Sequence, residues 1–275
     1  MPTLGVVPFV PDLRIAHEDA VALDPGQRPF TAPKPGQLDL AVIQLPHVAN
    51  FDEFDALAAE PGVALRYVRR SEELGDPTAI LLPGTKMTLS DLAWLRAQGL
   101  DQAILAARAR GSAVVGICGG YQLLGRWLAD PQGMEGPAGV VAPGLGLLPV
   151  TTRFERQKQT HLACLLRDGE RLRGYEIHTG ESTLDEPAQP FGVIVERSGV
   201  PVAIPDGAVT EDGRVWGAYL HGIFENDSFR HRWLRELGWQ GEVVFTTTLR
   251  QSEYDRLADV VENAVDWAAI QRLLE

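Results

Sequence analysis

Short apolar runs alternate with helical segments through the first half of the chain. Four runs rich in valine, isoleucine and leucine predict buried strands, at residues 38–45, 63–68, 79–82 and 113–117. Helices are expected at residues 50–57, 88–99, 100–110 and 121–128. Asn50 is the expected cap of the first helix. Alternating strands and helices with short connections predict an α/β fold, with a central, mostly parallel sheet flanked by helices on both faces.

The second half of the chain has shorter runs of alternating polarity. They predict antiparallel strands at residues 150–154, 159–164, 172–178 and 191–195. Residues 207–220 predict a hairpin that turns at Asp212-Gly213. A helix is expected at 227–237, and two amphipathic segments within 249–274 are expected to pack back on the domain. The second half is therefore predicted to be β-rich and antiparallel.

The first 37 residues are rich in proline. Proline removes a backbone donor and restricts its neighbour, so this stretch is not expected to form a long helix. We interpret residues 1–37 as an interdomain linker or arm and residues 38–275 as one domain. The arm has the character of a connection to a further domain that precedes it.

Composition narrows the possible partners and the compartment. The formal net charge of −12 argues against nucleic acid or an anionic membrane surface as a partner. No apolar stretch approaches the roughly 18 residues that span a bilayer, and no signal peptide is evident. With only Cys118 and Cys164, a disulfide framework is not expected, which favours a reducing cytoplasm. The cysteines and histidines form no metal-ligand cluster of usual spacing, so no metal site is expected.

Cys118 lies where an apolar strand gives way to a helix. The segment Gly116-Ile-Cys-Gly-Gly-Tyr-Gln122 places glycines on both sides of the thiol. A reactive side chain at a sharp strand-to-helix turn is the layout of a nucleophile elbow. The start of a helix also favours a thiolate through its dipole and free N–H groups. The alternative is a buried core cysteine, but the glycine-flanked turn favours a nucleophile.

His221 is the best candidate for the general base. It follows the second strand of the predicted hairpin, so it can reach the same edge of the sheet as Cys118. His178 also follows a strand and is the competitor, although a binding or supporting role is favoured for it. The remaining histidines are expected to be ordinary surface groups: His17, His47, His161 and His231.

The turn at Gly84-Thr85-Lys86 is the candidate oxyanion hole. A glycine-rich turn after a strand can direct backbone N–H groups into a cleft, and the N–H of Gly119 supplies a second donor. The alternative is a plain strand-to-helix turn. The turn is not a phosphate loop because its spacing differs from that motif. No nucleotide site is therefore expected in this chain.

Three motifs together resemble those of class I glutamine amidotransferases. They are Gly116-Ile-Cys-Gly-Gly-Tyr-Gln122, Gly174-Tyr-Glu-Ile-His178 and Tyr219-Leu-His-Gly-Ile-Phe-Glu-Asn226. The match is to the branch of cobyric acid synthases and cobyrinic acid diamide synthases. Residues 4–14 and 253–258 are similar to the linker and the C-terminal part of the cobyric acid synthases. The resemblance covers nearly the whole chain and implies a flavodoxin-like fold.

The resemblance implies a Cys–His glutaminase. Cys118 would attack glutamine and form a thioester, and His221 would assist. Gln122 matches a position that contacts glutamine, and Tyr175 and His178 fall in the second motif; the alternative for Gln122 is a solvated helix residue. The ammonia would pass to an ATP-using synthetase domain or subunit that amidates the carboxylates of a corrinoid, converting adenosylcobyrinic acid a,c-diamide to cobyric acid. ATP and magnesium are expected there, and no cofactor is expected in this chain.

Two departures from the family pattern leave alternatives open. Many class I amidotransferases have glutamate two residues after the catalytic histidine, where this chain has Ile223. A Cys–His pair without that acid is therefore implied, with Glu225 as a weak candidate to orient His221. No synthetase domain is found in this sequence. The alternatives are an amidotransferase subunit that works with a Mur-ligase-like protein on lipid II, and a non-catalytic corrinoid-binding or scaffold domain.

Overall fold

The computed structural model describes residues 3–11, 13, 33–50, 52–185 and 188–274 and contains two sheets. The first sheet has the strand order β11-β12-β4-β3-β1-β2, and every neighbouring pair is parallel except β11 with β12. Its strands are β1 (Leu38–Ile43), β2 (Val63–Val68), β3 (Ala79–Leu82), β4 (Ala113–Ile117), β11 (Ala208–Val209) and β12 (Val215–Ala218). The prediction of a mostly parallel α/β sheet is confirmed.

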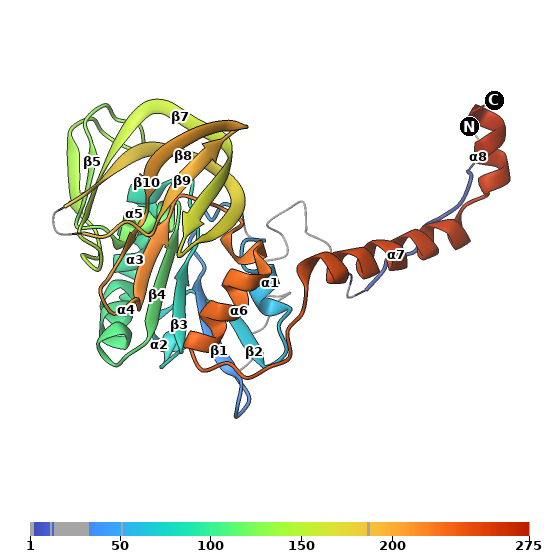
Figure 1. The fold of residues 1–275 in the computed structure, drawn as a ribbon, viewed down its shortest axis with the longest axis horizontal. Coiled ribbons are helices and arrows are strands. Elements are labelled where there is room, and N and C mark those ends of the chain that lie inside the picture. The colour runs from blue at the N-terminus through green and yellow to red at the C-terminus, as the bar shows by residue number, and fades with distance from the viewer. Residues whose placement is uncertain (1–2, 12, 14–32, 51, 186–187, 275) are drawn as a thin grey trace.

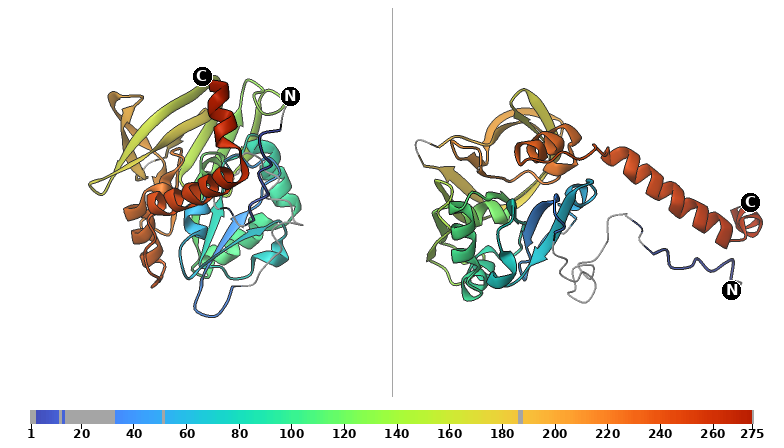
Figure 2. Two further views of the ribbon diagram at one scale, coloured as in Figure 1. Left: turned by 90° about the vertical axis from the view of Figure 1, so that its right-hand side faces the viewer. Right: turned by 90° about the horizontal axis from the view of Figure 1, so that it is seen from below.

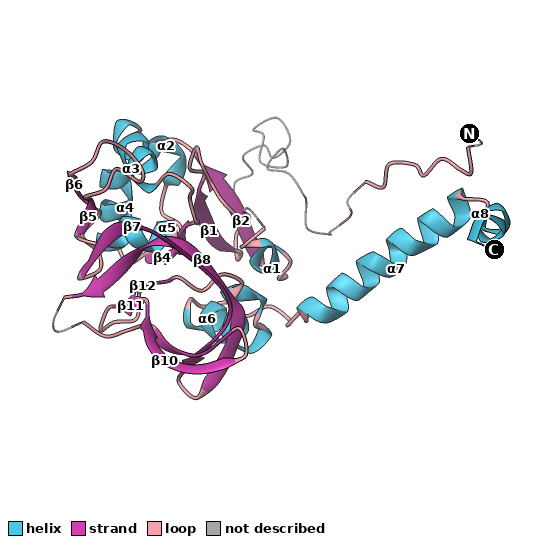
Figure 3. Cartoon of the chain, turned by 90° about the horizontal axis from the view of Figure 1, so that it is seen from above, coloured by secondary structure: helices cyan, strands magenta, loops and turns pink. Residues whose placement is uncertain are grey.

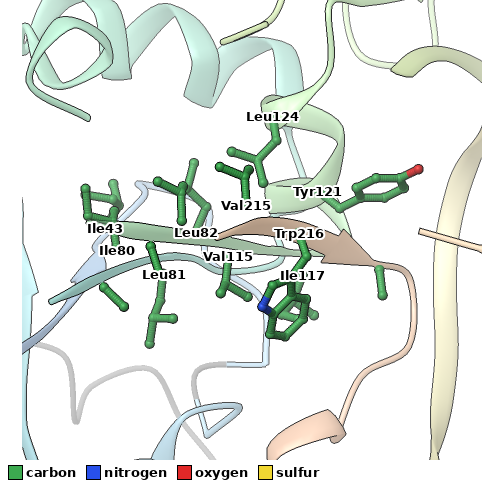
Figure 4. Packing of buried hydrophobic residues seen from close by; sticks show 14 of the residues in the cluster. Ile43, Ile80, Leu81, Leu82, Val115, Ile117, Tyr121, Leu124, Val215 and Trp216 are labelled. Atoms are coloured by element: carbon green, nitrogen blue, oxygen red, sulfur yellow. The ribbon is translucent and has the colours of Figure 1, made fainter. Parts of the chain in front are cut away.

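Helices cover both faces of this sheet. Helices α2, α3 and α4 lie on one side, and α1 and α6 lie on the other (Figure 3). The bounds are α1 (Asp55–Ala58), α2 (Ser71–Leu74), α3 (Thr88–Ala97), α4 (Leu100–Ala109), α5 (Gly119–Leu124) and α6 (Asp227–Glu236). The core forms where these helices meet the apolar strands, with Leu82 and Val115 of neighbouring strands among the packed side chains (Figure 4).

The second sheet is mostly antiparallel and is built around one long hairpin (Figure 1). Its order is β10-β9-β7-β5-β6, and β8 pairs with β7. Its strands are β5 (Trp127–Asp130), β6 (Val140–Pro143), β7 (Val150–Arg167), β8 (Glu170–Leu184), β9 (Gly192–Arg197) and β10 (Val200–Asp206). The β-rich character of the second half is confirmed. Strand β8 reaches the first sheet through a bridge between Tyr175 and His221.

Three sequence predictions about individual elements are wrong. The helix expected at 121–128 ends at Leu124, because Gly125 has an extended backbone and residues 127–130 form β5. The two strands expected at 150–154 and 159–164 are one continuous strand, β7. Asn50 caps no helix: its φ is 52° and α1 begins only at Asp55.

The C-terminal helices stand away from the domain, contrary to the expectation that they pack back on it. Helix α7 (Thr246–Ala264) has no buried residue, and it leads to α8 (Trp267–Leu274) at the far end (Figures 1 and 2). Residues 3–11 run beside them: the N–H of Asp266 donates to the carbonyl of Leu4 at 2.7 Å. An amphipathic pattern shows that a helix has an apolar face but not what covers it. In the described part of the chain, no helix has the length and apolarity needed to cross a membrane.

Candidate active site

Cys118 occupies the sharp turn between β4 and α5. It has φ 52° and ψ −112°, a conformation that costs free energy for any residue other than glycine and that clusters at functional sites. The turn fits only because its neighbours lack side chains. A β-carbon on Gly120 would lie 2.0 Å from the carbonyl oxygen of Leu82, and one on Gly116 would lie 2.5 Å from that of Gly120. The glycines of the motif thus allow the close approach of strand, turn and helix.

His221 lies at the same edge of the sheet as Cys118. Strand β12 pairs in parallel with β4, and Ala218 is opposite Ile117, so the residues after both strands are neighbours. The N–H of His221 donates to the carbonyl of Tyr175 at 2.8 Å. The two rings stack with centroids 5.1 Å apart, and the histidine is buried. Tyr175 therefore fixes both the backbone and the ring plane of His221.

Glu53, which the sequence analysis did not single out, contacts His221 directly. Its Oε2 lies 2.7 Å from Nδ1 of the imidazole, and its Oε1 accepts the N–H of Gly222 at 2.8 Å. The side-chain amide nitrogen of Asn50 lies 3.1 Å from Nδ1. Glu225, the weak candidate from the sequence, instead pairs with Arg250 at 2.6 Å. Glu53 lies between β1, which ends at Ile43, and α1, within the segment 50–57 that the sequence predicts as a helix, so no motif marked it.

The surroundings of His221 favour its charged form. Burial by itself lowers the pKa of an imidazole, but the interactions with Cys118 and Glu53 outweigh it and raise the pKa of His221 from 6.5 to about 10. Near neutral pH the ring is therefore an imidazolium beside the thiol. That arrangement stabilises a thiolate electrostatically and provides a proton for a leaving group.

The turn after β3 lies against the start of α5 and beside the cysteine and histidine. A β-carbon on Gly84 would stand 3.1 Å from Cε1 of His221 and 3.6 Å from Cβ of Cys118. One on Gly119 would be 2.6 Å from Cγ2 of Thr85. The Thr85 hydroxyl donates to a carboxylate oxygen of Asp91 at 2.5 Å, which holds the turn. The structure thus brings both predicted oxyanion segments to one place.

Gln122 is buried and fully engaged with the protein, so its alternative as a solvated helix residue is wrong. Its amide nitrogen donates to the Thr179 carbonyl and to the Tyr219 hydroxyl, each at 3.1 Å. Its amide oxygen accepts the Thr88 hydroxyl at 2.9 Å. His178 stacks on Tyr219 with centroids 3.8 Å apart. Both residues line the cavity, and both tie strand β8 to the rest of the site.

A cavity of about 260 Å³ connects these groups. Cys118 and His221 line it together with groups of both charges, Lys86, Lys158 and Glu135. Glu135, which the sequence analysis missed, accepts the Leu89 N–H at 2.8 Å, and burial raises its pKa to about 7. Ligand pockets usually measure about 300–1,000 Å³. A small cavity with cationic and anionic side chains suits a molecule of amino-acid size.

Among the described residues, the other histidines, His47, His161 and His231, do not line this cavity. His231 is buried and lies 2.8 Å from Glu60, so the prediction that it is a surface group is wrong. His47 is partly exposed and lies 2.7 Å from Asp91, and His161 lies 3.2 Å from Gln159. His17 lies outside the described residues.

Comparisons with known proteins agree on one family. The model of the CobB/CobQ-like glutamine amidotransferase domain matches residues 39–229. A cobyric acid synthase of Chloroflexus aurantiacus is 48% identical over 100% of this chain and 55% of that protein. One of Sorangium cellulosum is 41% identical over 100% of this chain and 57% of that protein. This chain thus spans about half the length of the curated relatives that it matches.

Solved structures share the fold at low sequence identity. A crystal structure of a glutamine amidotransferase superposes with a TM-score of 0.54 and 21% identity, over 72% of this chain and 97% of that one. The PurLQS structure from Thermotoga maritima gives a TM-score of 0.51 and 20% identity, over 67% and 87%. At these identities the likeness supports the fold alone.

Proposed function

This chain belongs to the CobB/CobQ-like glutamine amidotransferase family, and from that premise we propose that it hydrolyses glutamine and delivers the ammonia to a corrinoid-amidating synthetase. The acceptor would be adenosylcobyrinic acid a,c-diamide, and the product cobyric acid. ATP and magnesium would bind to the synthetase part, in the portion of the curated relatives that this chain does not match. Full-length relatives named cobyric acid synthase support this choice over an acceptor such as lipid II.

The proposed reaction proceeds in two halves around Cys118. The thiolate attacks the side-chain amide carbon of glutamine, and the resulting oxyanion accepts backbone N–H groups near Gly84 and Gly119. The His221 imidazolium donates its proton to the amide nitrogen, which leaves as ammonia and yields a γ-glutamyl thioester. A water molecule then gives a proton to the neutral imidazole and attacks the thioester. The carboxylic acid formed loses its proton to solvent and leaves as glutamate, and the thiolate–imidazolium pair is restored.

One observation carries the proposal: Cys118 and His221 both lie next to Gly84, and both line a cavity that also contains charged side chains of both signs. Lys86 and Lys158 suit the α-carboxylate of glutamine, and Glu135, whose pKa burial raises to about 7, would be held in its ionised form by the α-ammonium group. The side-chain amide would then lie toward the thiol. The cavity therefore matches free glutamine better than a large acyl donor.

A glutamine analogue that carries an electrophilic diazoketone tests this assignment. Mass spectrometry should find one adduct, on Cys118, and glutamine should protect against it. Cys118→Ser should abolish both labelling and glutamate release, whereas Cys164→Ser should keep them, since Cys164 lies in strand β7 and does not line the cavity. Labelling that persists in Cys118→Ser would refute the assignment.

The acceptor is tested with a fusion to the part of a relative that this chain does not match. We would join this chain to the unmatched portion of the Chloroflexus aurantiacus relative and supply ATP, magnesium and amide-labelled glutamine. The expected result is ATP-dependent transfer of the label into the corrinoid. Glutamine hydrolysis with no corrinoid labelling would contradict the acceptor while preserving the glutaminase.

A further inference from the structure

We propose that Glu53 is a positioning residue that completes a Cys118–His221–Glu53 triad. The acid would then come from the segment between β1 and α1, and not from the position two residues after the histidine. The inference rests on the proposed glutaminase function, which it deepens by assigning the third member of the site.

Both oxygens of the Glu53 carboxylate hold the histidine segment. One lies 2.7 Å from Nδ1 of His221, and the other accepts the Gly222 N–H at 2.8 Å. The side chains of both residues are almost completely buried, with 1% exposure for His221 and 2% for Glu53. A carboxylate at Nδ1 keeps a proton there and leaves Nε2 for the cleft, which is the tautomer that a base at Cys118 requires.

The neighbouring residues make Glu53 the acid that fits this role. Ile223 is fully buried and belongs to the hydrophobic core, so its position supplies no polar group. Glu225 forms its ion pair with Arg250 on α7. Asn50, on the same segment as Glu53, places its amide nitrogen 3.1 Å from Nδ1 and 3.3 Å from Nε2, and because that nitrogen is a donor it supplies no acceptor for a ring proton.

A positioning role differs from a structural one in its effect on the titration of His221. The charged and titratable groups around the ring come from several elements. They are Cys118, Tyr175, Asp52, Glu53 and Glu225, together with the cavity residues Lys86, Lys158, Glu135 and His178. Among them, only Glu53 is a carboxylate within hydrogen-bond distance of the imidazole in the described residues. Removing its charge should therefore change the proton affinity of the ring, whereas removing the charge of Glu225 should not.

The experiment compares Glu53→Gln with Glu225→Gln as the matched control. The first readout needs no substrate: the imidazole nitrogen shifts of His221 are followed against pH by NMR, with the resonance assigned by its loss in His221→Asn. We expect the pKa of His221 to fall by about 1–3 units in Glu53→Gln and to stay in place in Glu225→Gln. Glu53→Asp should recover part of the shift.

The second readout is glutaminase kinetics. Glu53→Gln should lower kcat by about 100-fold or more with little change in KM, and the high-pH limb of the rate should move to lower pH with the pKa of His221. A pKa that stays in place in Glu53→Gln, or that moves in Glu225→Gln instead, would overturn the proposal. If the unaltered protein releases no glutamate but the NMR shift occurs, the glutaminase assignment fails while the Glu53–His221 coupling stands. Thermal unfolding confirms that each variant is folded.

Discussion

Replacing Gly84 with alanine tests how closely the nucleophile and the histidine must approach each other. The backbone of Gly84 is not in the left-handed region, so alanine fits its conformation. The added methyl would nevertheless stand 3.1 Å from Cε1 of His221 and 3.6 Å from Cβ of Cys118. The first distance is tighter than ordinary van der Waals contact. Either the imidazole moves away, or the space for the amide oxygen is filled.

The expected costs of Gly84→Ala differ for stability and for activity. A glycine-to-alanine change at a compatible position contributes about 0.4–1 kcal/mol through the unfolded state. The tight contact offsets part of this, so the free energy of unfolding should change by less than about 1 kcal/mol. Loss of oxyanion stabilisation, by contrast, costs about 2.7–4 kcal/mol, or about 10²–10³-fold in kcat. Activity should therefore fall far more than stability.

Glutamate release gives the kcat of Gly84→Ala, and urea unfolding gives its stability. Gly136→Ala is the control: a β-carbon there meets nothing within 4 Å, and its backbone is also outside the left-handed region. The control should keep the activity and stability of the unaltered protein. A Gly84→Ala variant with unchanged kcat would show that the space between Cys118 and His221 is not used by the reaction.

Three further predictions concern charge, burial and the tail. Because the pKa of His221 is raised from 6.5 to about 10, the stability that its charged form contributes is complete below pH 6.5 and is lost as the pH rises toward 10. Part of the rise comes from Cys118, so Cys118→Ala should reduce this pH dependence. Thermal unfolding measured across this pH range checks both statements. Arg230→Met should lower the free energy of urea unfolding by about 1.5–3 kcal/mol, because the buried Glu60 carboxylate loses its 2.7 Å partner but keeps His231 at 2.8 Å. Removal of residues 252–275 should change that free energy by less than about 0.5 kcal/mol and leave glutamate release intact, since α7 buries no residue.

The central sheet and the ends of its strands could be predicted because short stretches of sequence are enough to indicate them. Each central strand is a short run of apolar residues, and such runs are buried on both faces of a parallel sheet. Cys118 comes directly after one of these strands, and His221 comes shortly after another. In a parallel sheet the ends of such strands lie at one edge, so the fold class predicts that the two residues are close. The glycines around Cys118 indicated the sharp turn for the same reason, since only they permit its contacts.

The wrong predictions concern elements whose structure depends on contacts with distant parts of the chain. The middle of β7, residues 155–160, is polar and mostly solvent-exposed, so alternation breaks there although hydrogen bonding to β8 resumes at Lys158. Strand β5 begins after Gly125 in a stretch whose leucine spacing favours helix. The apolar face of the tail gave no information on whether the domain covers it. In each case tertiary contacts decide what the local pattern leaves open.

The contact between Glu53 and His221 shows that the absence of an acid two residues after the histidine does not mean that the histidine has no acidic partner. The family pattern places the acid two residues after the histidine in sequence. A hydrogen bond to Nδ1 requires only that the acid be near in the folded structure, and here the two partners are 168 residues apart in sequence. A buried imidazole needs an acceptor for its N–H, because an unsatisfied buried donor costs about 1–3 kcal/mol. With Ile223 unable to provide one, some other group at the carboxyl edge of the sheet must. The segment between β1 and α1 supplies that group through Glu53, a contact that only the folded structure reveals.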